Sequence, residues 1–209
     1  MKTFESLPAD KQQRIINAAL KEFADQGFDN ASTNRIVKAA QIGKGMLFYY
    51  FKSKKDLFDY LIDFSNSLMK EEALEAVDGE ERDFLKRMMQ MSRVNSAFLS
   101  KYPDLTAFMN KVMMHELERV SPIQMEQLQK LTQESYEKVY GNIDRTLFRE
   151  DIDPETAFQL IRWTLDGYGQ DMNRKFQETD VRDVDMDPYF DEFDGYIEVL
   201  RKAFYKKEE

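Results

Sequence analysis

The residues best suited to binding a charged partner lie between Asn30 and Lys55. Three consecutive aromatic residues, Phe48, Tyr49 and Tyr50, stand in this segment beside cations and hydroxyl groups. It contains no Asp or Glu, and its cations are Arg35, Lys38, Lys44, Lys52, Lys54 and Lys55. Such groups bind phosphates, and on a short helix they can reach base edges in a major groove. The pattern favours a nucleic-acid surface, although a basic, solvated face of an ordinary helical domain is the alternative.

The charge of the chain is divided unevenly along its length. The formal net charge of the 209 residues is -9, which by itself argues against binding to nucleic acid. Residues 1–58, however, hold 10 Lys and Arg against 6 Asp and Glu, while the remainder holds 20 against 33. This asymmetry indicates two modules of different function.

Helical periodicity organises the amino-terminal part of the chain. Apolar residues from Ile15 to Phe23 predict a helix over about 9–26 that stops at Gly27. A second, short helix is expected after Ser32 or Thr33, followed by a break at 41–43 and a third helix over 44–50. The succession of helix, tight turn and helix suits insertion of the third helix into a major groove.

Capping signals mark most of the later helices. Ser53 and Asp56 are spaced as a capping box, and Ser121, Pro122 and Gln124 form a second strong helix start. Further helices are predicted over about 53–77 and 80–101, around the apolar residues from Leu105 to Met113, and from Pro122 onward. The last two are predicted over about 154–176 and 188–205, after Asp153 and Asp187. The sequence therefore predicts an all-α protein of about nine helices without strands. We expect a helix-turn-helix DNA-binding domain over 1–52 and a helical-bundle ligand-binding and dimerisation domain over 53–209.

The segment Ser32–Phe51, followed by Lys54 and Leu57, resembles the TetR family of tetracycline-repressor-like regulators. The resemblance covers about 14–61 and implies that Lys44, Gly45, Met46 and Tyr49 lie in the major groove of operator DNA. It further implies that Thr33, Asn34, Tyr50 and Lys54 hold phosphates. The expected DNA-binding residues are Thr33, Asn34, Arg35, Lys44, Gly45, Met46, Phe48, Tyr49, Tyr50, Lys54 and Lys55.

Three positions depart from the family pattern. Gln41 stands where the family usually has a turn glycine, Gly43 replaces a Ser or Thr cap, and Phe48 replaces a tyrosine. Phe48 has no hydroxyl to donate to a phosphate, and Gly43 has no side chain to cap a helix. These departures affect the expected contacts rather than the expected fold.

Soft and aromatic side chains in the central helices predict an apolar cavity for a small-molecule effector. The expected ligand-binding residues are Met88, Met91, Phe108, Met113, Tyr136, Tyr140, Trp163 and Tyr168. Plain core packing is the alternative for each of them. The excess of acidic residues could favour a lipophilic cation, or could merely solvate the protein.

A homodimer is expected because a palindromic operator matches two DNA-binding helices related by a two-fold axis. In the final helix, apolar residues step by three and four as in a coiled-coil seam. The residues of this predicted interface are Phe190, Phe193, Ile197, Leu200 and Phe204. Packing of the same residues against their own domain is equally compatible with the spacing.

No catalytic constellation is found in the sequence. The chain has no cysteine, and its single histidine, His115, lacks neighbours with metal-ligand spacing. Asp183, Asp185 and Asp187 resemble the opening of a calcium loop, but Pro188 stands where that loop needs glycine. We therefore predict no enzyme, no metal and no cofactor.

Together these features predict a cytoplasmic, ligand-responsive regulator. The resemblance implies a repressor that a small apolar or amphipathic molecule releases from a palindromic operator, with no membrane partner. A helical protein that sequesters a ligand, or that serves as an interaction scaffold without binding an operator, is the alternative.

Overall fold

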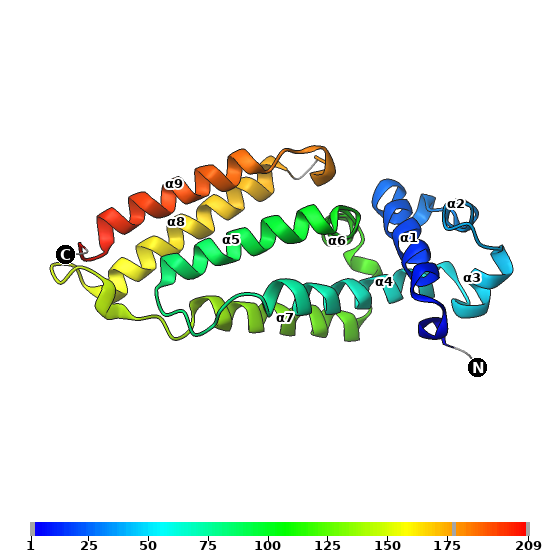
Figure 1. Ribbon diagram of the computed structural model, residues 1–209, viewed down its shortest axis with the longest axis horizontal. Helices are drawn as coiled ribbons and strands as arrows, with labels where there is room; N and C mark the ends of the chain where they lie inside the picture. Colours follow the sequence, from blue (N-terminus) through cyan, green and yellow to red (C-terminus); the bar gives the residue numbers. More distant parts are fainter. Residues whose placement is uncertain (1–2, 177–178, 208–209) are drawn as a thin grey trace. The chain divides into compact units, whose positions relative to one another are not determined.

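A computed structural model describes residues 3–176 and 179–207. Within these ranges the chain is all-α, without a strand, and Phe148 and Tyr205 form an isolated β-bridge. The α-helices are α1 (Ala9–Asn30), α2 (Thr33–Ala39), α3 (Lys44–Tyr50), α4 (Lys54–Met69), α5 (Phe84–Lys101), α6 (Pro103–His115), α7 (Pro122–Tyr140), α8 (Pro154–Lys175) and α9 (Asp187–Phe204) (Figure 1). The predicted fold class and the bounds predicted for α3 are confirmed.

The capping signals in the sequence correspond to hydrogen bonds in the structure. The backbone N–H of Gln124 donates to the Ser121 hydroxyl, and the N–H of Ser121 donates to the Gln124 side chain, both at 3.3 Å. The Ser53 hydroxyl accepts from the N–H of Asp56 at 3.0 Å. Asp153 likewise accepts from the N–H of Thr156 at 2.8 Å. These contacts satisfy amides that would otherwise lack partners at the helix starts.

Four predicted helix ends differ from the structure. The helix predicted from about residue 80 begins only at Phe84, as α5. The first helix continues past Gly27 to Asn30, because Gly27 absorbs a bend at a φ of 68° that other residues rarely adopt. The fourth ends at Met69 and passes into a π-helical turn, Lys70–Leu74, instead of continuing to 77. The last begins at Asp187, so Asp187 is a first-turn residue and not the cap; the N–H of Asp187 donates to the Asp185 carboxylate at 3.2 Å.

One compact unit contains Met1–Met69 together with Tyr102–Lys130. Helix α1 packs on α2, α4 and α6 in this unit. Its centre is a cluster of three buried phenylalanines, Phe23, Phe58 and Phe108, whose ring centroids lie 5.2 to 6.2 Å apart. Burial of such rings supplies much of the free energy that holds α1, α4 and α6 together.

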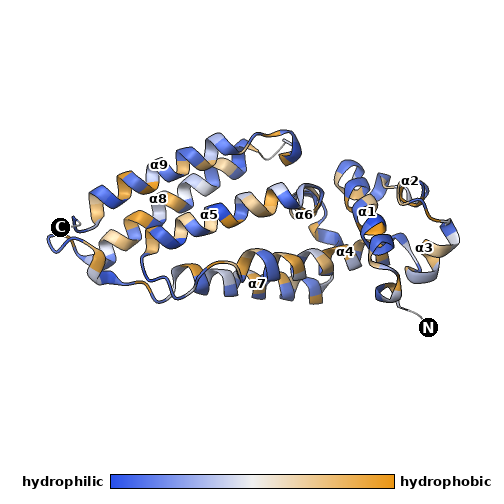
Figure 2. Ribbon diagram, in the orientation of Figure 1, coloured by the Kyte–Doolittle hydropathy of each residue, from blue (hydrophilic) through white to orange (hydrophobic). Residues whose placement is uncertain are grey.

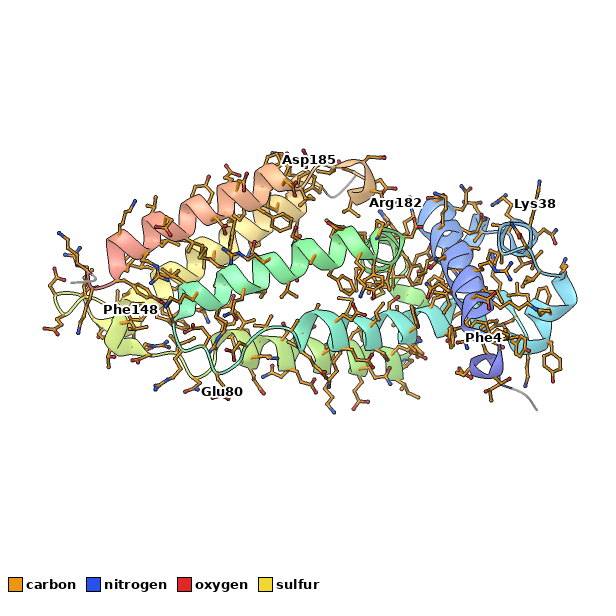
Figure 3. All side chains as sticks on the ribbon, viewed as in Figure 1. Phe4, Lys38, Glu80, Phe148, Arg182 and Asp185 are labelled. Carbon is orange, nitrogen blue, oxygen red and sulfur yellow. The ribbon has the colours of Figure 1, made fainter. Side chains whose placement is uncertain are left out.

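A second compact unit contains Lys70–Lys101 and Leu131–Glu209. Figure 1 shows α8 and α9 side by side, and their apolar faces pack with α5 in one core that includes Leu85, Ile161 and Ile197. Figure 2 shows polar and apolar residues alternating around α5 and α8, as expected for amphipathic helices. Phe148, labelled in Figure 3, packs edge-on against Tyr205 at 5.0 Å in the same core.

Arg87 is fully buried in this second unit without a carboxylate partner among the described residues. Its guanidinium donates to the carbonyls of Gly79, Glu81, Lys138, Val139 and Gly141. Three of these carbonyls belong to the end of α7 and the residues after it. Burial lowers the pKa of Arg87, while neighbouring carboxylates oppose this effect. Arg87 thus donates to backbone carbonyls of two separate segments of the second unit and joins them.

The two units do not follow the order of the chain, since residues 102–130 belong with the amino-terminal helices. The division at residues 52 and 53 predicted from the sequence concerns function and stays a prediction. Among the described residues, every helix is too short or too polar to cross a membrane.

Candidate DNA interface and ligand pocket

Helices α2 and α3 are joined by a tight turn at Gln41–Gly43. The N–H of Ile42 donates to the carbonyl of Val37 at 3.0 Å, which closes the turn. Gln41 adopts a φ of 56°, in the left-handed region, so the position that the family fills with glycine keeps a glycine-like backbone here. Gly43 precedes α3 with an extended backbone and gives no side-chain cap. The helix-turn-helix geometry is therefore present without its usual turn residues.

Helix α3 has one buried face and one exposed face. Leu47 is buried, at 1% exposure, and fixes the helix on the core of its unit. On the other side Lys44 and Gly45 are exposed, as are Phe48 and Tyr49, which retain 37% and 50% of their surface. A Cβ added to Gly45 would meet no atom within 4 Å. Large aromatic groups left exposed on so short a helix indicate a surface for a partner.

The other predicted contact residues on these helices divide by burial. Asn34 is exposed at the start of α2, and Thr33 is half-buried beside it. Met46 and Tyr50 are also half-buried, and the Tyr50 ring lies edge-on to Phe4 at 5.9 Å. Asn34 is thus accessible to a partner, whereas Thr33, Met46 and Tyr50 are accessible only in part, and the Tyr50 ring is engaged in packing.

Three of the predicted DNA-binding cations, Arg35, Lys54 and Lys55, bind other groups of the protein. Arg35 pairs with Glu22 at 2.5 Å, and Lys55 pairs with Asp59 at 2.5 Å. Burial acts to raise the pKa of Glu22, but hydrogen bonds from Arg35 and from the N–H of Ser32 outweigh it, so the pKa is lowered. Arg35 and Lys55 can reach a phosphate only by giving up part of these contacts.

Lys54 caps the end of α1. Its ammonium donates to the carbonyls of Phe28, Asp29 and Ala31 at 2.6, 3.1 and 3.1 Å, which occupies all three of its donors. The same ammonium lies 4.7 Å from the Phe28 ring centroid. Lys54 therefore joins the start of α4 to the end of α1, a role that the sequence did not suggest.

Two exposed cations of the acid-free segment lie outside the predicted contact set. Lys38 projects from α2, where Figure 3 labels it, and Lys52 follows the end of α3. Neither forms an ion pair with another described residue under a 4.0 Å limit. Their position in the segment without Asp or Glu was the sequence signal that could have identified them as DNA-contact residues.

The second unit contains a pocket of about 620 Å³ between α5, the end of α7, α8 and the start of α9. Its walls include four of the predicted ligand-binding residues, Met88, Met91, Tyr140 and Tyr168. The hydroxyl of Tyr140 donates to Asp166 at 2.7 Å, and burial together with this carboxylate raises the pKa of Tyr140. Burial, and to a smaller extent the nearby Glu192 carboxylate, raises the pKa of Tyr168 to about 12. Both tyrosines are therefore neutral hydrogen-bonding groups at neutral pH.

The other four predicted ligand-binding residues do not line this pocket. Phe108 is buried in the core of the first unit, and Met113 is 47% exposed on α6 of that unit. Tyr136 and Trp163 are 47% and 62% exposed in the second unit. The sequence also missed the polar wall residues, which are Ser92, Asn95, Asp166, Gln170 and Asn173.

The seam predicted on the last helix faces its own chain. Ile197 and Leu200 are buried in the core of the second unit, and Phe193 and Phe204 pack against the same core. Phe190 and Phe193 also line the pocket. Four of the five seam residues therefore pack within their own unit, and contact of this seam with a second copy stays a prediction.

The fold and the exposed α3 together define an all-α helix-turn-helix protein. The family model of bacterial regulatory proteins of the tetR family matches residues 15–61. The chain is 33% identical over 69 residues to the HTH-type transcriptional regulator YhgD of Bacillus subtilis. This alignment covers 33% of the chain and 36% of YhgD. Residues 15–61 are therefore similar to the DNA-binding segment of the tetR family.

Solved structures resemble the chain over nearly its whole length. The ketosteroid transcriptional regulator KstR2 of Mycobacterium tuberculosis has a TM-score of 0.62 at 14% identity, covering 97% of this chain and 98% of that one. The regulator FadR of Bacillus subtilis, solved with stearoyl-CoA, has a TM-score of 0.53 at 19% identity, covering 90% and 96%. At these identities the likeness shows the fold, while the alignment to YhgD spans only about a third of that relative's length.

Proposed function

We propose that this protein is a DNA-binding transcriptional regulator that responds to a small molecule. The observation that carries the proposal is the exposed face of α3, with Lys44, Gly45, Phe48 and Tyr49 on a helix-turn-helix of the matched family. An exposed glycine lets a backbone approach base edges, and the neighbouring Lys and Tyr donate hydrogen bonds to them. Gene regulation would place its action in the cytoplasm.

The pocket of the second unit supplies the proposed effector site. Its volume, about 620 Å³, lies within the range of about 300 to 1,000 Å³ for small-molecule sites. We propose a repressor that an apolar or amphipathic effector releases from a palindromic operator. Release requires that the effector bind the DNA-free conformation more tightly than the DNA-bound one.

We propose a homodimer in which the outward faces of α8 and α9 meet. Leu160 and Trp163 on α8, and Tyr196 and Val199 on α9, are between 40% and 62% exposed despite being large and apolar or aromatic. The Tyr196 ring lies 5.3 Å from that of Tyr168, which joins the exposed face of α9 to α8. Burial of such a face between two copies gives the two-fold symmetry that a palindrome requires. In sedimentation experiments the unaltered protein should behave as a dimer, and Trp163→Asp should behave as a monomer.

The DNA-binding proposal is tested by selecting binding sites from a random pool of duplexes with the full chain. The selected site should bind with an affinity that falls steeply as salt is raised. Lys44→Ala should weaken binding by about tenfold, as expected for loss of one base contact. Lys86→Ala is the matched control, since Lys86 is an exposed lysine of the second unit. Enrichment of no sequence, or equal weakening by both variants, contradicts the proposal.

A further inference from the structure

The pocket wall carries a single formal charge. Of the described side chains that line it, Asp166 alone is charged at neutral pH, and no Lys, Arg or His is among them. The Tyr140 hydroxyl holds one carboxylate oxygen of Asp166 at 2.7 Å. The carboxylate is therefore fixed in orientation and keeps acceptor capacity for another donor.

The rest of the wall is soft and aromatic. Four methionines, Met88, Met91, Met172 and Met186, surround the pocket with five aromatic rings. The rings are those of Tyr140, Tyr168, Tyr189, Phe190 and Phe193. Methionine adapts to irregular apolar groups, and the faces of aromatic rings attract cations. The Lys175 ammonium already lies 4.4 Å from the Tyr189 ring centroid, so this ring is in use as a cation acceptor at one face.

One edge of the pocket is strongly acidic. Met186, Tyr189, Phe190 and Phe193 come from the segment 183–200, which contains seven Asp and Glu and no Lys or Arg. Several of these carboxylates are exposed, including Asp187, Asp191 and Glu192. A concentration of one sign of charge beside a low-dielectric hollow raises the local concentration of the opposite charge. This edge of the pocket therefore favours cations and repels anions.

Two cations oppose this field. The Arg162 Nε lies 4.0 Å from Asp166, at the limit of an ion pair, and its guanidinium donates to the Tyr136 hydroxyl at 2.9 Å. The same Nε is buried without a hydrogen-bond partner among the described residues. Lys175 is the second cation, beside Tyr189. The charge of Arg162 thus neutralises that of Asp166 only in part. Removal of the Asp166 charge would leave the positive charge of Arg162 beside the pocket wall.

We infer that the pocket takes an amphipathic molecule with one positive charge, with its cationic group against Asp166 and its apolar part among the methionines and aromatic rings. This inference rests on the proposed function for its regulatory meaning, but concerns binding alone. Asp166 and the acidic edge weaken the binding of a molecule that has the same apolar chain and an anionic head group.

The test is calorimetric titration of the full chain, without DNA, with three ligands of equal chain length. These are decyltrimethylammonium, decanol and decanoate, used below their aggregation concentrations. The cation should bind at least about tenfold more tightly than decanoate, with decanol between them, because one charge contact and the ring faces discriminate. Equal or tighter binding of decanoate, or no binding of the cation, overturns the inference.

Asp166→Asn tests the assigned residue, since asparagine keeps the shape and can accept from Tyr140. This variant should lose about tenfold in affinity for decyltrimethylammonium, gain in affinity for decanoate and bind decanol unchanged. Asp171→Asn is the matched control on α8, because Asp171 is exposed, pairs with Arg174 and does not line the pocket. An unchanged ratio of cation to anion affinity in Asp166→Asn also overturns the inference.

The failure of this inference differs from failure of the proposed function. If the selected DNA binds but the cation does not, the regulator remains and its ligand class is wrong. If the cation binds in an Asp166-dependent way but no DNA is selected, the ligand class stands and the protein is a binding protein of another kind.

Discussion

The exposed face of α3 and the pocket of the second unit differ in how many segments of the chain form them. On α3 the side chains are few, exposed and set on a helix of seven residues, while the pocket draws its wall from four separate helices. A short helix displays neighbours in sequence on one face, so its contacts follow from a motif. A pocket depends on which faces of distant helices meet. The sequence therefore predicts the exposed face of a short helix, whereas it predicts the wall of a pocket only in part.

The largest expected effect is in the unit that holds the pocket. Arg87→Met should lower the free energy of unfolding by about 3 kcal/mol or more, because five backbone carbonyl oxygens at the wholly buried Arg87 lose their donor. Urea unfolding followed by circular dichroism measures it. Arg93→Met is the control, since Arg93 is exposed on the same helix. A loss below 1 kcal/mol would show that water replaces the guanidinium.

Two neighbours on α3 separate stability from binding in the other region. Leu47→Ala should cost about 2 to 4 kcal/mol of stability, because Leu47 is buried in the core. Tyr49→Ala should leave stability within about 0.5 kcal/mol and weaken binding to the selected DNA by about tenfold or more. Urea unfolding and fluorescence anisotropy measure the two quantities. If Tyr49→Ala unfolds the protein or leaves affinity unchanged, the outward face of α3 has been misassigned.

Gly45→Ala sharpens the same contrast. Alanine should raise stability by about 0.5 to 1 kcal/mol, since a Cβ meets no atom and alanine is the better helix former. The same Cβ should weaken DNA binding by about tenfold, because it keeps the backbone away from the base edges. A variant that is more stable and binds equally well would remove the close approach assigned to Gly45.

The smallest effect concerns acid stability of the second unit. Burial acts to raise the pKa of Asp83, but hydrogen bonds from Arg201 and the N–H of Lys86 outweigh it, and the pKa is lowered. A depressed carboxyl pKa contributes stability above the unfolded value, about pH 4, that is lost as the pH falls further. Unfolding free energies from pH 6 to pH 2.5 should therefore decline less steeply in Asp83→Asn. Parallel curves for variant and parent would contradict the assignment.

The sequence predicted local structure well wherever a single short segment contained the signal. The pair Ser121 and Gln124 determined a helix start, and the pattern around Leu47 determined which side of α3 is buried. Gly27 was identified as a special position, although it bends a helix where a stop was predicted.

What the sequence could not show depends on contacts between distant segments. Nothing near Lys54 indicates that its three donors meet the end of α1, more than twenty residues earlier. Phe108 and Met91 are both large apolar residues in predicted helices, yet Phe108 is buried in a core and Met91 lines a pocket. Asp166 was overlooked because a carboxylate on an amphipathic helix is most often solvated.

The central claim, that the outward face of α3 recognises DNA bases, is tested most directly by a ratio of affinities. Fluorescence anisotropy at one salt concentration gives the affinity for the selected site and for a scrambled duplex of equal length. The ratio should fall by about tenfold in Lys44→Ala, because a base contact is lost while most phosphate contacts remain. An unchanged ratio, or a ratio of one in the unaltered protein, would contradict the claim.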